Sequence, residues 1–189
     1  MVLDWAPRAE AGQGAPSSAP VTVGFAGVPS AHKGWPRFQH LFRRFSADPA
    51  CRFVYFGIGP VHIAGLTHIP VHVSAEAPDA MIRAMQAKGV DLVLHWTRWP
   101  ETFSFSTYET LAAGAFVLTN PLSGNVAAMV EETGRGAVLR DADDLDRAFG
   151  DGRVMALAAQ ARALRQSHDA RHALGDMTLA VLHNQRATP

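Results

Sequence analysis

Two acidic residues, Glu101 and Glu109, are separated by seven residues in the stretch VDLVLHWTRWPETFSFSTYETLAAGAFVLTN, residues 90–120. A carboxylate suits a partner with paired hydroxyl groups, because each of its oxygens can accept a hydrogen bond from one of them. A hydrogen bond to a charged group contributes roughly 1.5–3 kcal/mol. The pair is therefore a candidate for binding the hydroxyls of a sugar or a ribose.

A second loop offers the opposite chemistry. Lys33 follows Gly27, which ends a predicted strand, and it stands beside Gly34 at the predicted start of a helix. A helix N-terminus and a lysine together attract phosphate, and a glycine lets the backbone approach a ligand closely. Diol acceptors in one loop and phosphate donors in another together describe a nucleotide sugar.

The elements around the two glutamates can be predicted from the pattern of residues. They are, in order, a strand at 91–95, a loop at 96–101, a helix that begins at Ser104 or Ser106 and ends before Gly114, and a strand at 115–119. The short apolar runs indicate strands buried on both faces, Pro100 disfavours helix before it, and a serine can cap the helix start. Both carboxylates then lie near the carboxyl end of the first strand, where open α/β sheets bind ligands.

The rest of the chain alternates in the same way. Further strands are predicted at Val21–Ala26, 52–56, around Val71 and Val73, and at 136–140; further helices are predicted at Trp35–Phe45, from Asp79 to Gly89, and at 126–132, 143–149, 153–168 and 171–184. Strands that alternate with helices imply a parallel sheet with helices on both faces. We therefore expect an α/β fold with a Rossmann-like, doubly wound parallel sheet.

Three parts of the chain are expected. Residues 1–20, rich in Ala, Gly, Pro and Ser, are typical of a linker or flexible arm, which suggests that the chain was cut from something longer. Residues 21–150 are expected to form the ligand-binding domain. Residues 151–189 are expected to form C-terminal helices that pack on it.

Composition narrows the classes of function. The chain has 189 residues, near the size of one domain, and a formal net charge of zero, so a broad attraction to nucleic acid or an anionic membrane is not indicated. Cys51 is the only cysteine, which excludes an internal disulfide and a cysteine cluster for zinc. No run approaches the ~20 apolar residues of a membrane span. The start, MVLDWAPRAE, is not a secretory signal, so we expect a cytoplasmic protein.

The segment PETFSFSTYETLAAGAFVLTN closely resembles the E-x7-E motif of retaining glycosyltransferases with the GT-B fold, particularly the large family four. VGFAGVPSAHKGW is similar to the first strand of that family's C-terminal domain, with a pattern of roughly G-R-x4-K-G. FVYFGIGP looks like its second strand, and SGNVAAMVEETGRGAVL looks like its G-G-x-x-E-x-V…G-x-L segment. The match covers about residues 21–149, in the right order.

The resemblance implies a single C-terminal domain of such an enzyme and assigns roles to its residues. Glu109 would hold the ribose hydroxyls of the donor, and Glu101 would contact hydroxyls of the transferred sugar. Backbone N–H groups of Thr102 and Phe103, with Ser104 at the helix start, would contact sugar or phosphate oxygens. Lys33 would neutralise the leaving diphosphate, which is the main catalytic demand.

The resemblance also implies the partners. The donor would be a nucleoside diphosphate sugar, the acceptor a glycan or another sugar acceptor, and the family usually needs no metal or other cofactor. The acceptor is bound mainly by an N-terminal domain that this chain lacks, so we expect weak donor binding and no turnover by the chain alone.

Two departures from the family pattern matter. Val28 stands where the family commonly has arginine, so one phosphate contact is missing. Asn125, Ala127 and Ala128 replace parts of the usual G-G-x-x-E segment, which puts the sugar contacts of that loop in doubt.

Other readings of the same residues stay open. Glu101, Glu109 and Lys33 are also compatible with ordinary solvated surface charges. Trp96 and Trp99 could stack on a base or sugar, but tryptophans more often pack structure. As whole-protein alternatives, the architecture also suits a nucleotide-sugar epimerase or a non-catalytic module that docks a partner protein.

Histidines give weaker signals. His95 ends a predicted strand, and such a residue is more often a hydrogen-bonded edge histidine than a catalyst. His168 and His172 stand four apart, as in a zincin motif with Asp for Glu, but no third ligand is evident, so a solvated helix end is favoured. Pocket residues for the base are expected near 73–78.

Overall fold

The computed structural model describes residues 19–166. The predicted helix at 171–184, the histidine pair at 168 and 172, and all but the end of the predicted N-terminal arm lie outside the described residues. Within them, six parallel strands form one sheet in the order β3-β2-β1-β4-β5-β6. The strands are β1 (Val21–Ala26), β2 (Cys51–Phe56), β3 (Thr67–Ile69), β4 (Leu92–His95), β5 (Phe116–Thr119) and β6 (Gly136–Val138).

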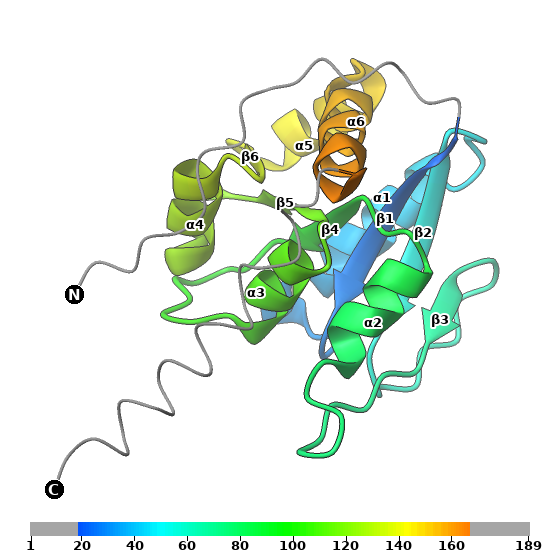
Figure 1. Cartoon of the computed structure of the whole chain (residues 1–189). Helices are drawn as coiled ribbons and strands as arrows, with labels where there is room; N and C mark the ends of the chain where they lie inside the picture. The colour runs from blue at the N-terminus through cyan, green and yellow to red at the C-terminus, as the bar shows by residue number, and fades with distance from the viewer. Residues whose placement is uncertain (1–18, 167–189) are drawn as a thin grey trace, which may run out of the picture.

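Helices cover both faces of this sheet (Figure 1). They are α1 (Trp35–Phe45), α2 (Ala80–Ala87), α3 (Phe105–Ala112), α4 (Asn125–Thr133), α5 (Ala142–Gly150) and α6 (Arg153–Gln166), with short 3-10 turns η1 (Ala31–Lys33) and η2 (Pro121–Ser123). Helices α1, α5 and α6 pack on one face, and α2, α3 and α4 pack on the other. The predicted doubly wound α/β fold is confirmed, with its strand order reversing between β1 and β4.

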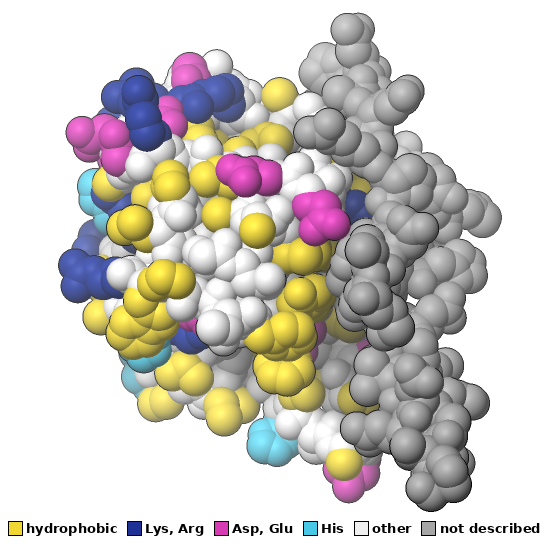
Figure 2. Space-filling model, turned by 90° about the vertical axis from the view of Figure 1, so that its left-hand side faces the viewer, with side chains coloured by type: hydrophobic (Ala, Val, Ile, Leu, Met, Phe, Trp, Pro, Cys, Tyr) yellow, Lys and Arg dark blue, Asp and Glu magenta, His cyan; other side chains and the backbone are white. Residues whose placement is uncertain are grey.

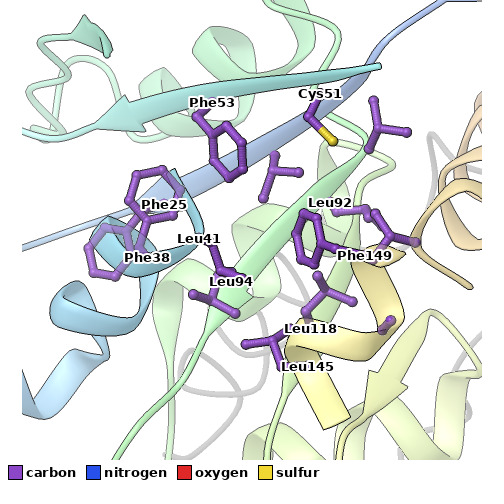
Figure 3. Close-up of a cluster of buried hydrophobic side chains, with 14 of the residues drawn as sticks. Phe25, Phe38, Leu41, Cys51, Phe53, Leu92, Leu94, Leu118, Leu145 and Phe149 are labelled. Carbon is purple, nitrogen blue, oxygen red and sulfur yellow. The ribbon is translucent and has the colours of Figure 1, made fainter. Parts of the chain in front are cut away.

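The larger core lies between the sheet and helices α1 and α5. Figure 3 shows the strand side chains of this cluster directed at the helices; its labelled members are Phe25, Phe38, Leu41, Cys51, Phe53, Leu92, Leu94, Leu118, Leu145 and Phe149. Phe25 contacts Trp35 and Phe38 at ring-centroid distances of 5.0 and 5.5 Å. Burial raises the pKa of Cys51 to about 11, so this thiol is a packing residue at neutral pH.

The third strand differs from the prediction. β3 spans Thr67–Ile69 and pairs in parallel with the end of β2, so the strand predicted around Val71 and Val73 is wrong. Pro70 ends the strand because proline has no N–H to donate to the ladder. Val71 is still buried in the core, whereas Val73 is exposed. The alternation of the two valines therefore comes from an irregular segment with one inward side chain and does not mark a strand.

Helix α6 is fastened to the amino-terminal edge of the sheet by a buried ion cluster. Asp91, only 1% exposed, accepts hydrogen bonds from Arg162 at 2.7 and 2.9 Å and from Arg165 at 2.6 Å. The backbone N–H of Thr22 also donates to Asp91, at 3.0 Å. Arg165 packs so closely on Gly114 that a Cβ there would lie 2.5 Å from its Cγ. This cluster holds the end of the described chain on the edge opposite the carboxyl ends of the strands.

Candidate functional site

A cation and a carboxylate from two loops meet at the carboxyl edge of the sheet. Lys33, at the end of η1 in the loop after β1, donates a 2.6 Å hydrogen bond from Nζ to Oε1 of Glu101, in the loop after β4. The Glu101 side chain is 10% exposed and that of Lys33 is 38% exposed. Because β1 and β4 are neighbours in the sheet, this contact lies where the strand order reverses.

Glu101 is held in place through its backbone by the segment after β5. Its N–H donates to the carbonyl of Ser123 at 3.1 Å, and its carbonyl accepts from the N–H of Asn125 at 2.9 Å. Gly124, between them, has a φ of 62°, and a Cβ there would lie 3.0 Å from the Glu101 carbonyl oxygen. The segment around Gly124, whose sugar contacts the sequence put in doubt, therefore positions the glutamate.

Lys33 is held by a second close approach of backbones. Gly34 has a φ of 88°, and a Cβ there would lie 2.4 Å from the carbonyl oxygen of Trp96. The N–H of Arg98 also donates to the carbonyl of His32 at 3.1 Å. The loops after β1 and β4 are thus joined by main-chain contacts, which fixes the spacing of the two charges.

The two tryptophans of the β4–α3 loop differ in their surroundings. Trp96 is half-buried and packs against the larger core. Trp99 is 50% exposed and stacks on His32, with ring centroids 4.6 Å apart and planes 15° apart. Trp96 therefore serves packing, whereas Trp99 presents part of its ring to solvent in the loop that carries Glu101.

Glu109 lies in α3 without a charged partner. Its side chain makes no hydrogen bond or ion pair among the residues that the structure describes, and partial burial raises its pKa. A carboxylate that is partly desolvated and has no cation suits a role toward a ligand better than a role in stability. It makes no hydrogen bond or ion pair with Lys33 or Glu101, so only two of the three predicted charges are paired in the structure.

The remaining predicted site residues lie on the same edge. Gly27 follows β1 with a φ of 105°, and nothing stands within 4 Å of the place a Cβ would take. Thr102 and Phe103 are exposed, and Ser104 is buried at the N-cap position of α3. The expected helix start is confirmed, but the capping bond is absent: Ser104 Oγ lies 3.4 Å from Ser106 Oγ and bonds no helix N–H.

Four buried side-chain atoms make no hydrogen bond within the described part of the chain. They are Tyr55 Oη, His95 Nε2, Thr107 Oγ1 and Asn125 Oδ1. All four belong to residues at the ends of β2 and β4 or in the first turns of α3 and α4, which is the edge that carries Lys33 and Glu101. Burial lowers the pKa of His95 to about 4. The expectation of a fully hydrogen-bonded edge histidine is therefore wrong.

Large exposed hydrophobic side chains gather on the same edge. Among the described residues they are Val28, Ile58, Val73, Trp99, Phe103, Phe105 and Leu122, and each lies in or just after a loop that follows the carboxyl end of a strand. Figure 2 shows hydrophobic side chains mainly in the lower half of one face, toward this edge. Exposed apolar side chains concentrated at one edge make this edge a candidate binding surface.

The described residues show neither a metal-binding cluster nor a membrane-spanning helix. In residues 19–166, no group of three or more His, Cys, Asp or Glu side chains is arranged to hold a metal ion. None of the helices in that range combines the length and apolar character needed to cross a bilayer.

Comparison with known proteins finds similarity at the level of structure. No family model and no curated protein sequence matches the chain. WaaG, a glycosyltransferase involved in lipopolysaccharide biosynthesis, is 15% identical with a TM-score of 0.54, over 84% of this chain and 46% of that one. HepE from Anabaena, in complex with UDP and glucose, is 16% identical with a TM-score of 0.53, over 87% and 48%.

The catalytic domain of starch synthase IV from Arabidopsis thaliana, bound to ADP and acarbose, is 14% identical with a TM-score of 0.53, over 82% of this chain and 38% of that one. At such identities the likeness establishes the fold, which is that of one domain of GT-B glycosyltransferases. The chain spans less than half the length of each of these structures.

Proposed function

We propose that the chain is the donor-binding domain of a retaining glycosyltransferase of the family-four type, which moves a hexose from a nucleoside diphosphate sugar to a glycan or another acceptor. The observation that carries the proposal is the contact between Lys33 and Glu101 at the point where the strand order reverses. Ligands of open α/β sheets bind in this position. A cation and a carboxylate there provide for a phosphate and for sugar hydroxyls.

Donor binding would proceed by exchange of partners. Lys33 and Glu101 neutralise one another in the unliganded chain. A diphosphate carries more negative charge than one carboxylate and competes with Glu101 for the ammonium group of Lys33. The ammonium group then stabilises the charge on the leaving diphosphate. Glu101 is then free to accept hydrogen bonds from hydroxyls of the hexose.

The other predicted residues complete the donor site in this proposal. Glu109, which has no partner of its own among the described residues, would accept from the ribose hydroxyls. The open backbone at Gly27 and the N–H groups of Thr102, Phe103 and Ser104 would approach phosphate or sugar oxygens. Charge compensation would come from Lys33 without a metal, so binding should survive removal of divalent ions.

An acceptor domain would cover the carboxyl edge. The exposed hydrophobic side chains on the loops after β1 to β5 support this part of the proposal, since such a surface is unusual on a domain that stands alone. The chain matches less than half of each structurally similar enzyme, which also supports a second domain. The isolated chain would then bind donor and transfer nothing.

A calorimetric screen tests the proposal. UDP, ADP and GDP, each with and without an attached hexose, are titrated into the 189-residue chain. Saturable binding of at least one nucleotide sugar is expected, with or without EDTA. A chain that binds none of them contradicts the proposal and favours a second candidate, a non-catalytic docking module. The exposed Val28 at the phosphate loop is the observation that keeps this candidate open.

A further inference from the structure

A buried histidine beside the Lys33–Glu101 contact has no part in the proposed donor site. His95 is the last residue of β4 and is 5% exposed, and its Nε2 has no hydrogen-bond partner among the described residues. Leaving a buried polar atom unpaired is unfavourable, and the rest of this strand is Leu-Val-Leu. An aliphatic residue would avoid the penalty, so the histidine calls for an explanation outside folding.

The free nitrogen is a hydrogen-bond acceptor. Burial is the largest cause of the low pKa of His95, which keeps the ring neutral near pH 7. The backbone of Ser106 acts on the ring in the opposite direction and raises that pKa. A neutral imidazole carries one N–H and one lone pair, and we assign the N–H to Nδ1 and the lone pair to Nε2. In that tautomer, Nε2 needs an O–H or N–H donor.

The surroundings of the ring narrow the donor further. His95 ends β4, and the loop after this strand carries Glu101, so the ring lies at the edge that holds the ion pair. The charges of Lys33 and Glu101 act on the pKa of His95 in opposite directions. Nε2 and the Glu101 carboxylate are thus two acceptors at the same edge of the sheet. A sugar offers two neighbouring hydroxyl donors, whereas a phosphate at neutral pH has oxygens that mainly accept.

We propose that His95 is a sugar-binding residue whose Nε2 accepts a hydrogen bond from one hydroxyl of the hexose, next to a hydroxyl held by Glu101. The inference rests on the proposed function and adds a residue that distinguishes the sugar from the nucleotide. Nε2 is shielded from solvent in the structure, so the proposal requires that the edge opens around the donor. The exchange of Lys33 from Glu101 to the diphosphate would provide that opening.

The test isolates the contribution of the sugar to affinity. Calorimetry on the full chain compares UDP with UDP-glucose, ADP with ADP-glucose and GDP with GDP-mannose, for wild type, His95→Leu and His95→Gln. His95→Leu should reduce the gain in affinity from the sugar about tenfold, which is the effect expected for the loss of one hydrogen bond. The affinity for the nucleoside diphosphate without sugar should not fall. His95→Gln, which keeps an acceptor oxygen, should recover part of the gain.

Tyr55→Phe is the matched control. It removes a buried hydroxyl at the same edge, on β2, and β1 separates that strand from β4. The gain from the sugar should be unchanged in this variant. An effect as large as that of His95→Leu would overturn the inference, because it would mean that any change at this edge weakens sugar binding.

Thermal unfolding provides a readout that a purely structural histidine would not share. His95→Leu should raise Tm, because it removes an unpaired polar atom, so its weaker sugar binding could not result from unfolding. A lower Tm with an unchanged gain from the sugar would overturn the inference and leave the proposed function standing. A wild-type chain that binds none of these compounds would overturn both.

Discussion

Lys33 and Glu101 lie 68 positions apart in the sequence, and their side chains meet at 2.6 Å across the loops that follow β1 and β4. In the proposed site, Glu101 thereby occupies the position of a phosphate next to Lys33, and Lys33 occupies the position of a sugar hydroxyl next to Glu101. The contact is partly exposed on the lysine side, so it contributes little to stability. In the proposed exchange, phosphate would take the ammonium group of Lys33 and sugar hydroxyls would donate to Glu101, so both side chains would keep hydrogen-bond partners.

Partner exchange predicts opposite effects on two ligands. Glu101→Gln releases Lys33 from its ion pair, so a bare nucleoside diphosphate should bind with equal or higher affinity. The gain in affinity from an attached hexose should fall, because a hydrogen bond to a charged group is lost. Calorimetry measures both, with Glu131→Gln, an exposed acid on α4, as the control. A variant that weakens the bare diphosphate strongly would contradict the exchange.

Glu109 carries a prediction about the nucleotide alone. Glu109→Ala should weaken binding of the diphosphate by about 1.5–3 kcal/mol, because the ribose hydroxyls lose a charged acceptor. An unchanged dissociation constant in calorimetry would remove the ribose role.

The raised pKa of Glu109 also predicts the sign of a stability change. Burial favours the protonated carboxyl, so the folded chain binds this proton more tightly than the unfolded chain does. This contribution is present at acid pH and is lost as pH rises through the folded-state pKa. Glu109→Gln should therefore stabilise the chain at neutral pH and do so less in acid, as urea unfolding at several pH values can measure. A gain that grows toward acid pH would contradict this assignment.

His95 predicts a dependence of the opposite sign. Its pKa is lowered from 6.5 to about 4 in the folded chain, so between these values the unfolded chain binds a proton that the folded chain does not, and the folded chain loses stability as pH falls. The shift corresponds to about 3 kcal/mol. Urea unfolding of His95→Leu should show a flatter pH profile in this window than wild type. Parallel profiles would place the acid sensitivity elsewhere.

The sequence predicted the strands that later carry the site, because β1, β4 and β5 are buried on both faces and read as short apolar runs. It could not predict the Asp91 cluster, since an aspartate before a strand is ordinary and its arginines lie 71 and 74 positions later. The role of Gly124 could not be predicted for a similar reason. A glycine in the sequence indicates only a flexible backbone position, and the fold is needed to show that Glu101 packs against it. The edge strand β3 was misplaced because Val71 is buried without belonging to a strand.

The Asp91 cluster predicts the largest loss of stability. Asp91→Ala leaves two arginines without their buried carboxylate, which should cost about 3–5 kcal/mol in the free energy of unfolding. Asp79→Ala is a suitable control, because Asp79 pairs with Arg83 on the surface and should change stability by less than about 1 kcal/mol. Denaturant unfolding compares the two, and equal losses would contradict the role of the cluster.

The most direct measurement of the central claim is a calorimetric titration of wild type and Lys33→Met with whichever nucleotide sugar the screen identifies. The account predicts saturable binding by wild type and an affinity at least about tenfold lower in the variant, because the diphosphate loses its charged donor. Equal affinities of two folded chains would contradict it, since binding would then occur away from the Lys33–Glu101 edge.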